Sequence, residues 1–234
     1  MPDKLQRPAW PQTKNEGYRR SVMQNFKIIS PYNNLITLKV TQGHFATSSS
    51  HINYYIDLTT LKARSSEAKA VAKSMASNYI ATTVVDAIVC LDGTDVIGAY
   101  LADELSESGI MCLNRHGTIY VITPEQNAMG QLTFRDNVVP IMIKGKNVLL
   151  LIATATTGHT IEKAMECIEY YGGKISGISA IFSAVDTVQG HDVNTIFHQD
   201  DITGYSSYQS HSCPFCEKGI KLDGLVSANG LNIL

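Results

Sequence analysis

The residues best suited to bind an anion lie close together in the chain and are mostly small and hydroxyl-bearing. They are Thr154, Thr156, Thr157, Gly158, His159 and Thr160. A threonine hydroxyl can donate a hydrogen bond to a phosphate oxygen, and backbone N–H groups at the start of a helix attract anions. The stretch therefore predicts a phosphate-binding loop, although an ordinary strand-to-helix turn also tolerates β-branched residues. His159 is suited to donate to a phosphate or stack on a base, or it is simply solvated.

The segments on either side of this loop have the patterns of a strand and a helix. Residues 148–152 form an unbroken apolar run, short enough for a strand that is buried on both faces. Residues 161–171 have a helical pattern that stops at Gly172 and Gly173, which favour a helix end. Because ligands of open parallel sheets bind at the carboxyl ends of strands, the loop has the right position for a binding site.

Residues 156–160, which read Thr-Thr-Gly-His-Thr, resemble the ribose-phosphate loop of the type I phosphoribosyltransferases. In that family two acidic residues and two small residues precede Thr-Thr-Gly-x-Thr/Ser. Here Ile152 and Ala153 replace the acidic pair. The resemblance implies a site for a phosphorylated ribose, either a nucleotide or phosphoribosyl pyrophosphate (PRPP).

The missing acidic pair implies a weakened site. In the family these carboxylates hold the ribose hydroxyls and help to position Mg²⁺, and neither Ile152 nor Ala153 can do so. Each lost hydrogen bond to a charged group is worth about 1.5–3 kcal/mol. Mg²⁺ bound with PRPP stays possible, because this ion keeps several waters and uses substrate phosphates as ligands.

The alternating pattern of residues 35–57 predicts a β-hairpin. It is similar to the hairpin of the orotate-type enzymes, which forms a hood over the base. Gly43 and Asp57 match the orotate-type pattern, and three aromatic residues match it as candidate hood residues: Phe45, Tyr54 and Tyr55. For Tyr54 and Tyr55 an ordinary role as strand aromatics stays open.

A second loop follows a predicted strand, residues 82–91, and precedes a predicted helix, residues 95–108. It reads Asp92, Gly93 and Thr94. In the family the equivalent turn approaches the pyrophosphate of PRPP, and a glycine permits that approach. The alternative is a plain aspartate turn in which Thr94 caps the helix.

The segment of residues 123–131 argues against efficient transfer. The orotate-type enzymes carry lysine and arginine in a mobile loop here, and these cations neutralise the departing pyrophosphate. This segment contains Glu125 and no lysine, arginine or histidine. Because stabilising that leaving group is largely electrostatic, the loop predicts weak or lost activity, with Arg135, Lys144 and Lys146 as partial substitutes.

Cys213 and Cys216 form a CxxC segment, which is half of a zinc site, a redox pair or a pair of structural thiols. A second CxxC is missing, so zinc would need other ligands. His198 and His211 are candidates, as is the CxxC of a second subunit. The histidines of the chain otherwise show no metal-binding spacing such as HxxxH.

The alternation of strands and helices over residues 65–183 predicts an α/β fold with a doubly wound, mostly parallel sheet. We expect an arm at 1–34 with a short helix near 20–29, a phosphoribosyltransferase-like domain at 35–185 and a C-terminal extension at 186–234. The short strands we expect include 110–113, 118–123, 174–183 and 193–197.

Composition narrows the partners. The chain has 234 residues and a net charge of −2, with no basic run, which argues against nucleic-acid binding. No apolar stretch is long enough to cross a bilayer, and residues 1–8 lack an apolar signal core, so we expect a cytoplasmic protein. The resemblance also implies a homodimer.

Two functions stay open. The first is an orotate phosphoribosyltransferase-like protein that binds a phosphorylated ribose, with weak or lost transferase activity. The alternative is an active enzyme of pyrimidine metabolism that transfers phosphoribosyl from PRPP to orotate or another pyrimidine base. The preserved loop supports both, and the lost charges favour the first.

Overall fold

The computed structural model describes residues 24–107, 112–115, 117–227 and 230–234. Its main sheet has the strand order β10-β11-β9-β8-β4-β5, in which all neighbours are parallel except β10 and β11. The strands are β4 (Ala87–Cys90), β5 (Tyr120–Ile122), β8 (Asn147–Ala155), β9 (Lys174–Ser183), β10 (Thr187–Val188) and β11 (His191–His198). This arrangement confirms the expected doubly wound, mostly parallel sheet.

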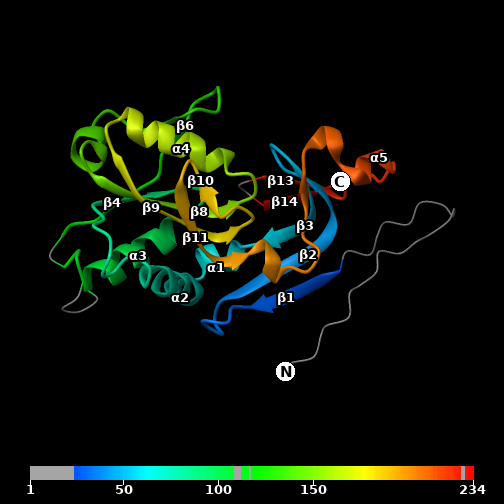
Figure 1. Cartoon of the computed structure of the whole chain (residues 1–234), viewed down its shortest axis with the longest axis horizontal. Coiled ribbons are helices and arrows are strands. Elements are labelled where there is room, and N and C mark those ends of the chain that lie inside the picture. Colours follow the sequence, from blue (N-terminus) through cyan, green and yellow to red (C-terminus); the bar gives the residue numbers. More distant parts are fainter. Residues whose placement is uncertain (1–23, 108–111, 116, 228–229) are drawn as a thin grey trace.

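Helices cover both faces of the main sheet (Figure 1). Helices α2 (Ser65–Ala76) and α3 (Asp95–Glu107) pack on one face, against side chains such as Leu149 and Leu151 of β8. Helix α4 (His159–Tyr170) and the π-helical turn η1 (Val139–Ile143) pack on the other face, against Leu150 and Ile152. Successive side chains of a strand point to opposite faces, so the apolar run of β8 serves two cores at once.

A second sheet, here called the hood sheet, contains the predicted hairpin. Its strands are β1 (Asn25–Ile29), β2 (Thr37–Ala46), β3 (His51–Asp57), β12 (Ser207–Tyr208), β13 (Gly224–Ser227) and β14 (Gly230–Ile233). Strands β2 and β3 pair antiparallel, which confirms the hairpin. The short helix α1 (Thr59–Ala63) follows β3 and leads back towards the main sheet.

The expected helix near residues 20–29 is wrong where the structure describes it. Residues 25–29 form β1, which pairs antiparallel with β2, and residues 20–23 lie outside the described part. Tertiary contacts explain the difference. Ile28 packs against the core and the ring of Phe26 meets that of Tyr54 edge-on at 5.8 Å. An alternating strand pattern is hard to tell from a helix in so short a segment.

The chain after residue 185 contributes to both sheets. Strands β10 and β11 extend the main sheet, and β11 contains the expected strand 193–197. Strand β13 pairs parallel with β2, so the C-terminal segment lies beside the hood hairpin. Between them lie two 3₁₀ turns, Gln199–Asp201 and Ser210–Ser212, and helix α5 (Pro214–Glu217). The division of the chain at residues 34 and 185 stays a prediction.

Other expected elements are shorter than the sequence indicates. Of residues 82–91 only β4 is a strand, and β5 is the core of the expected strand 118–123. The expected strand 110–113 lies partly outside the described residues, and Cys112 and Leu113 are not in a strand. The segment after β5 forms a small hairpin of β6 (Glu125–Gln126) and β7 (Leu132–Thr133). Within the described residues, no helix has the length and apolar character needed to span a membrane.

Candidate functional site

A cavity of about 790 Å³ opens at the carboxyl ends of the main-sheet strands, where the hood sheet faces them. One wall is the loop between β8 and α4. The opposite wall comes from the turn between β2 and β3 and from β13. The remaining lining residues include Lys62 of α1, Asp92 and Gly93 after β4, and Tyr205. The cavity therefore collects loops that are distant in sequence.

The loop between β8 and α4 has an open row of backbone donors. Within the described residues, nothing accepts a hydrogen bond from the N–H groups of residues 156–161; the first helical bond is from Glu162 to the carbonyl of Gly158. Gly158 has φ 82° and serves as the N-cap of α4. A side chain there would be strained, and its Cβ would lie 3.0 Å from Val188 Cγ2. The glycine therefore fixes the backbone shape of a loop whose residues line the cavity.

All the predicted phosphate-loop residues line the cavity: Thr154, Thr156, Thr157, Gly158, His159 and Thr160. Thr157 and Thr160 are exposed, and Thr156 is half-buried. The Nδ1 atom of His159 lies 3.0 Å from the Glu162 carboxylate, one turn along α4. This contact leaves Nε2 as the ring atom of His159 that remains for a ligand.

Lys62 of α1 meets the turn after β4 and adds a cation to the lining of the cavity. This lysine is not among the site residues predicted from the sequence. The Nζ of Lys62 donates a hydrogen bond of 2.6 Å to the backbone carbonyl of Asp92. Asp92 and Gly93 both have positive φ, 55° and 73°, and both line the cavity. Burial raises the pKa of the Asp92 carboxyl, and the nearby Lys62 charge partly opposes that rise.

Thr94 has a structural position. Its side chain is fully buried, and its hydroxyl donates to the carbonyl oxygens of Leu91 and Leu151, at 2.8 and 3.2 Å. It does not line the cavity. The threonine therefore connects the turn after β4 to β8, the strand that leads into the candidate phosphate-binding loop.

The three candidate hood aromatics have different surroundings. Phe45 is fully buried, and Tyr54 is buried with its hydroxyl donating to the Thr203 carbonyl at 3.2 Å. Tyr55 alone of the three lines the cavity. Partial burial raises the pKa of its phenol. Of the three aromatic residues, Tyr55 is therefore the one that a ligand in the cavity could contact.

The groups expected to weaken transfer lie at the site. Ile152 and Ala153 line the cavity at the end of β8. Arg135, one of the possible substitute cations, forms an ion pair with Glu125 and does not line the cavity. Among the described lining residues, Lys62 is the only lysine or arginine and Asp92 the only carboxylate.

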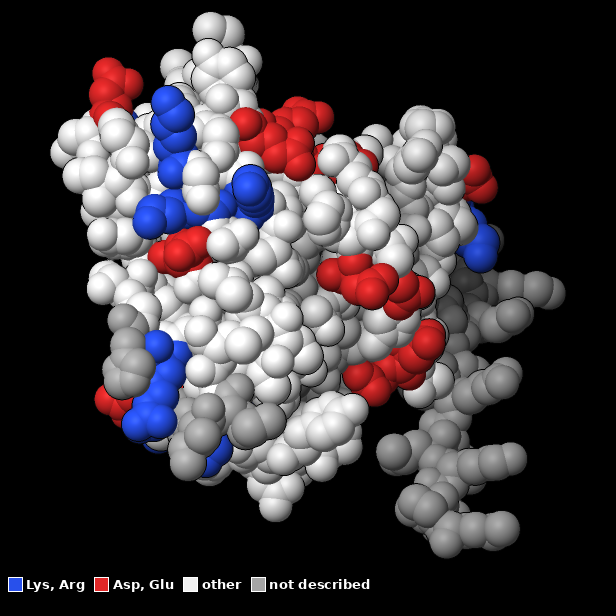
Figure 2. Space-filling view, turned by 60° about the vertical axis from the view of Figure 1, so that its left-hand side comes forward, with Lys and Arg blue, Asp and Glu red and all other residues white. Residues whose placement is uncertain are grey.

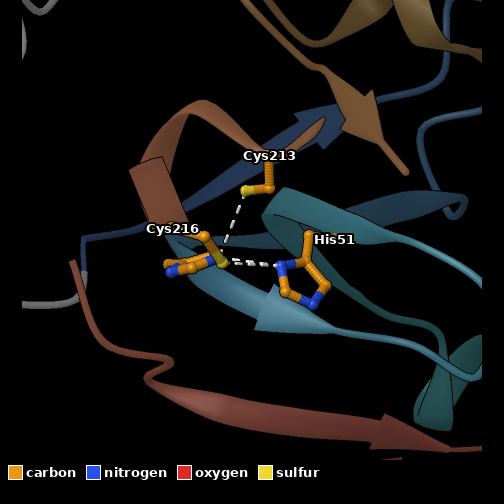
Figure 3. A group of neighbouring side chains, drawn as sticks. His51, Cys213 and Cys216 are labelled. Atoms are coloured by element: carbon orange, nitrogen blue, oxygen red, sulfur yellow. Dashed lines mark hydrogen bonds between the residues drawn. The ribbon is translucent and has the colours of Figure 1, made fainter. Parts of the chain in front are cut away.

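The CxxC segment lies against the hood hairpin. Cys213 and Cys216 form a cluster with His44 of β2 and His51 of β3, in which all candidate ligand atoms lie within 4.8 Å of one another. Figure 3 shows the side chains of His51, Cys213 and Cys216 converging from the two segments. No pattern in the sequence indicates this grouping, because His44 and His51 are far from the cysteines along the chain.

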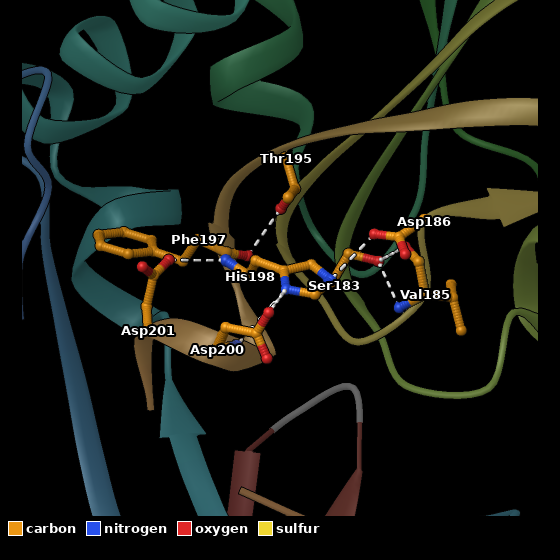
Figure 4. A network of polar contacts seen from close by, with 8 residues as sticks. All are labelled: Ser183, Val185, Asp186, Thr195, Phe197, His198, Asp200 and Asp201. Carbon is orange, nitrogen blue, oxygen red and sulfur yellow. Dashed lines mark hydrogen bonds and ion pairs between the residues drawn. The ribbon is translucent and has the colours of Figure 1, made fainter. Parts of the chain in front are cut away.

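The suggested ligand His198 lies elsewhere, at the end of β11 (Figure 4). Its imidazole sits between two carboxylates, 3.1 Å from Asp186 through Nε2 and 3.4 Å from Asp200 through Nδ1. The Asp186 contact lacks the alignment of a hydrogen bond. The backbone N–H of His198 donates to the Asp201 carboxylate at 2.8 Å. His198 is therefore not part of the cysteine cluster, and neither is His211.

Comparison with solved structures identifies the class of fold. UMP synthase from Leishmania donovani aligns with a TM-score of 0.50 and 19% identity, over 69% of this chain and 34% of that one. Orotate phosphoribosyltransferase from Mycobacterium tuberculosis, in complex with Fe(III) dicitrate, aligns with a TM-score of 0.48 and 16% identity, over 70% of this chain and 91% of that one. The fold is that of the type I phosphoribosyltransferases.

Within that class the sequence match is to an orotate enzyme. An orotate phosphoribosyltransferase from Caldanaerobacter subterraneus is 30% identical over 80 residues. That match covers 34% of this chain and 40% of the relative's length. No family model matches the chain. The chain thus has a phosphoribosyltransferase-like fold, and the part of its sequence that matches is similar to an orotate phosphoribosyltransferase.

Proposed function

We propose that this protein binds a phosphorylated ribose, a nucleotide or PRPP, at the loop of residues 154–160 and has weak or no transferase activity. One observation carries the proposal: within the described residues, the consecutive N–H groups of residues 156–161 have no acceptor, and these same residues line a cavity. Such a row at a helix N-terminus suits a phosphate, because the N–H groups and the helix dipole both favour an anion.

The weak transfer follows from the charges around the cavity. Departure of pyrophosphate needs cations positioned on the developing negative charge. Lys62 is the one lysine or arginine among the described lining residues, and its Nζ is already bonded to the Asp92 carbonyl. Mg²⁺ would accompany PRPP largely through phosphate and water ligands, with Asp92 as the available carboxylate.

Binding is tested with ribose 5-phosphate and with uridine monophosphate, by thermal unfolding and calorimetry. Both ligands should raise the melting temperature of the wild type. Thr157→Val should weaken binding about 10- to 150-fold, since a hydrogen bond to a charged group is worth about 1.5–3 kcal/mol. Thr187→Val, an exposed strand position outside the cavity, is the matched control and should bind normally. If neither ligand shifts melting, the protein has no such site.

The alternative is an active transferase, and Lys62 is the observation that favours it. Incubation with orotate, PRPP and Mg²⁺ separates the two functions. We expect little or no orotidine monophosphate. Rapid turnover that Lys62→Ala removes would instead establish transfer at this site.

We also propose a homodimer that associates through the hood sheet. The end of β1 and the turn that follows it expose three large apolar side chains: Ile29, Tyr32 and Leu35 are 58%, 77% and 60% exposed. Apolar surface of this kind on a sheet edge favours association.

A further inference from the structure

We propose that His44, His51, Cys213 and Cys216 bind one Zn²⁺ ion in a tetrahedral Cys₂His₂ site that fastens the C-terminal segment to the hood hairpin. The four ligand atoms come from β2, β3 and the segment around α5. Sites with four protein ligands leave no open coordination position, so this zinc would be structural. The inference is independent of what binds in the cavity.

The distances between the ligand atoms fit a single tetrahedral ion. Zinc bonds of about 2.05 Å to nitrogen and 2.3 Å to sulfur separate two nitrogens by about 3.3 Å and a nitrogen from a sulfur by about 3.6 Å. His44 Nε2 and His51 Nδ1 lie 3.2 Å apart. The nitrogen–sulfur separations are 3.4 Å from Cys213 to His44, 3.8 Å from Cys216 to His44 and 3.3 Å from Cys216 to His51.

The hydrogen bonds of His44 fix the tautomer that a metal requires. Its Nδ1 faces two backbone carbonyl oxygens, of Ile220 at 3.0 Å and Lys221 at 3.2 Å. Carbonyl oxygens only accept, so Nδ1 carries the proton and the lone pair of Nε2 points at the two sulfurs and at His51. Metal-binding histidines characteristically donate their second N–H to a carbonyl or carboxylate in this way.

The surroundings of the cluster also suit a closed structural site. Cys213 is fully buried and His44 is 1% exposed, while Cys216 lies at the surface and provides access for the ion. The ring of Phe215, between the two cysteines in sequence, stacks on His44 with centroids 5.2 Å apart. Burial excludes water and strengthens the attraction between a divalent cation and two thiolates.

The chain around the cluster links it to the cavity. The backbone of His44 exchanges hydrogen bonds with Asp223, whose carboxylate accepts from His44 N at 2.8 Å and whose N–H donates to His44 O at 2.7 Å. Strand β13 follows directly and lines the cavity, as does the turn of residues 47–49 between the two histidine ligands. An ion here would therefore hold both segments of that wall together.

The experiment measures zinc in the full-length protein, produced without a histidine tag under reducing conditions. We expect about one zinc per chain in the wild type and almost none in Cys213→Ser or His51→Ala. Cys167→Ser and His191→Ala, which alter residues of the same types outside the cluster, should keep the metal. Circular dichroism establishes whether each variant is folded.

A second measurement does not depend on variants. Cobalt added to zinc-depleted wild type should give the intense d–d bands of a tetrahedral ion and a sulfur-to-metal charge-transfer band. A wild type that takes up neither zinc nor cobalt, or keeps its zinc in folded Cys213→Ser, overturns the proposal. So does a Cys213–Cys216 disulfide in place of metal in the reduced preparation.

Discussion

At the scale of single residues, the cavity combines the proposed phosphate-binding loop with a carboxylate, Asp92, whose ionisation is unfavourable. Burial raises its pKa more than the Lys62 charge lowers it. A negative charge at Asp92 also repels any phosphate in the same cavity. Both effects make Asp92 a residue whose charge costs stability and ligand affinity at neutral pH.

We predict that Asp92→Asn stabilises the protein at pH 7 and that the gain disappears in acid. Because the folded pKa lies above the unfolded value of about 3.9, Asp92 contributes most to stability when protonated, below that value. This contribution is lost as the pH rises through the folded pKa. Asparagine is uncharged throughout and tolerates the positive φ of 55°. Urea unfolding of both proteins at pH 3 and pH 7 measures the difference. Equal stability differences at both pH values would contradict the prediction.

The sequence points to those candidate site residues that are neighbours in the chain. Residues 156–160 are recognisable because one local segment carries the whole phosphate-binding pattern. Lys62 is separated from Asp92 by 30 positions, and their contact depends on how α1 packs beside the turn after β4. His44 and His51 are still farther from their cysteine partners. Such contacts depend on tertiary packing, which the spacing of residues along the sequence does not predict.

At the scale of elements, the loop before α4 depends on Gly158 for its shape. Gly158 and Gly190 have the same positive φ of 82°. A Cβ at Gly158 would lie 3.0 Å from Val188, whereas a Cβ at Gly190 would have nothing within 4 Å. The two glycines therefore make a matched pair, with equal backbone strain and different surroundings.

We predict that Gly158→Ala and Gly190→Ala each lower the free energy of unfolding by about 1–2 kcal/mol, because alanine is unfavourable in the left-handed region. Only Gly158→Ala should also weaken ribose 5-phosphate binding, by about tenfold or more, since the shifted loop no longer aligns its N–H groups. Urea unfolding and calorimetry measure the two quantities. Equal binding by both variants would mean that the loop shape does not matter to the ligand.

The elements differ in how clearly the sequence predicts them. Strand β8 and helix α4 are evident, because a buried parallel strand is apolar throughout and an amphipathic helix has a regular stripe. Strands β1, β13 and β14 are not evident. They are short, they lie in the hood sheet with exposed residues, and β13 and β14 begin at glycines. Their pairing partners, rather than their own composition, make them strands.

At the scale of the whole molecule, charge does not suggest a polyanionic partner. On the face in Figure 2, lysines and arginines form small separate groups next to acidic residues. The net charge of −2 agrees with this distribution. Association of two subunits would therefore depend on shape and apolar surface. The exposed apolar side chains at the end of β1 and in the turn that follows it are the place to test this association.

We predict that the protein is a dimer of 25.6 kDa chains at micromolar concentration and that Ile29→Glu or Tyr32→Glu converts it to a monomer. Strand β1 pairs with β2 alone among the described strands, so one of its edges is unpaired. Stable interfaces centre on buried apolar and aromatic groups, and a carboxylate there would be desolvated without a partner. Size-exclusion chromatography with light scattering measures the mass.

Tyr170→Glu, at a residue of α4 that is 83% exposed, is the control and should remain dimeric. A monomeric wild type, or a dimer that both hood variants preserve, would exclude association through this surface.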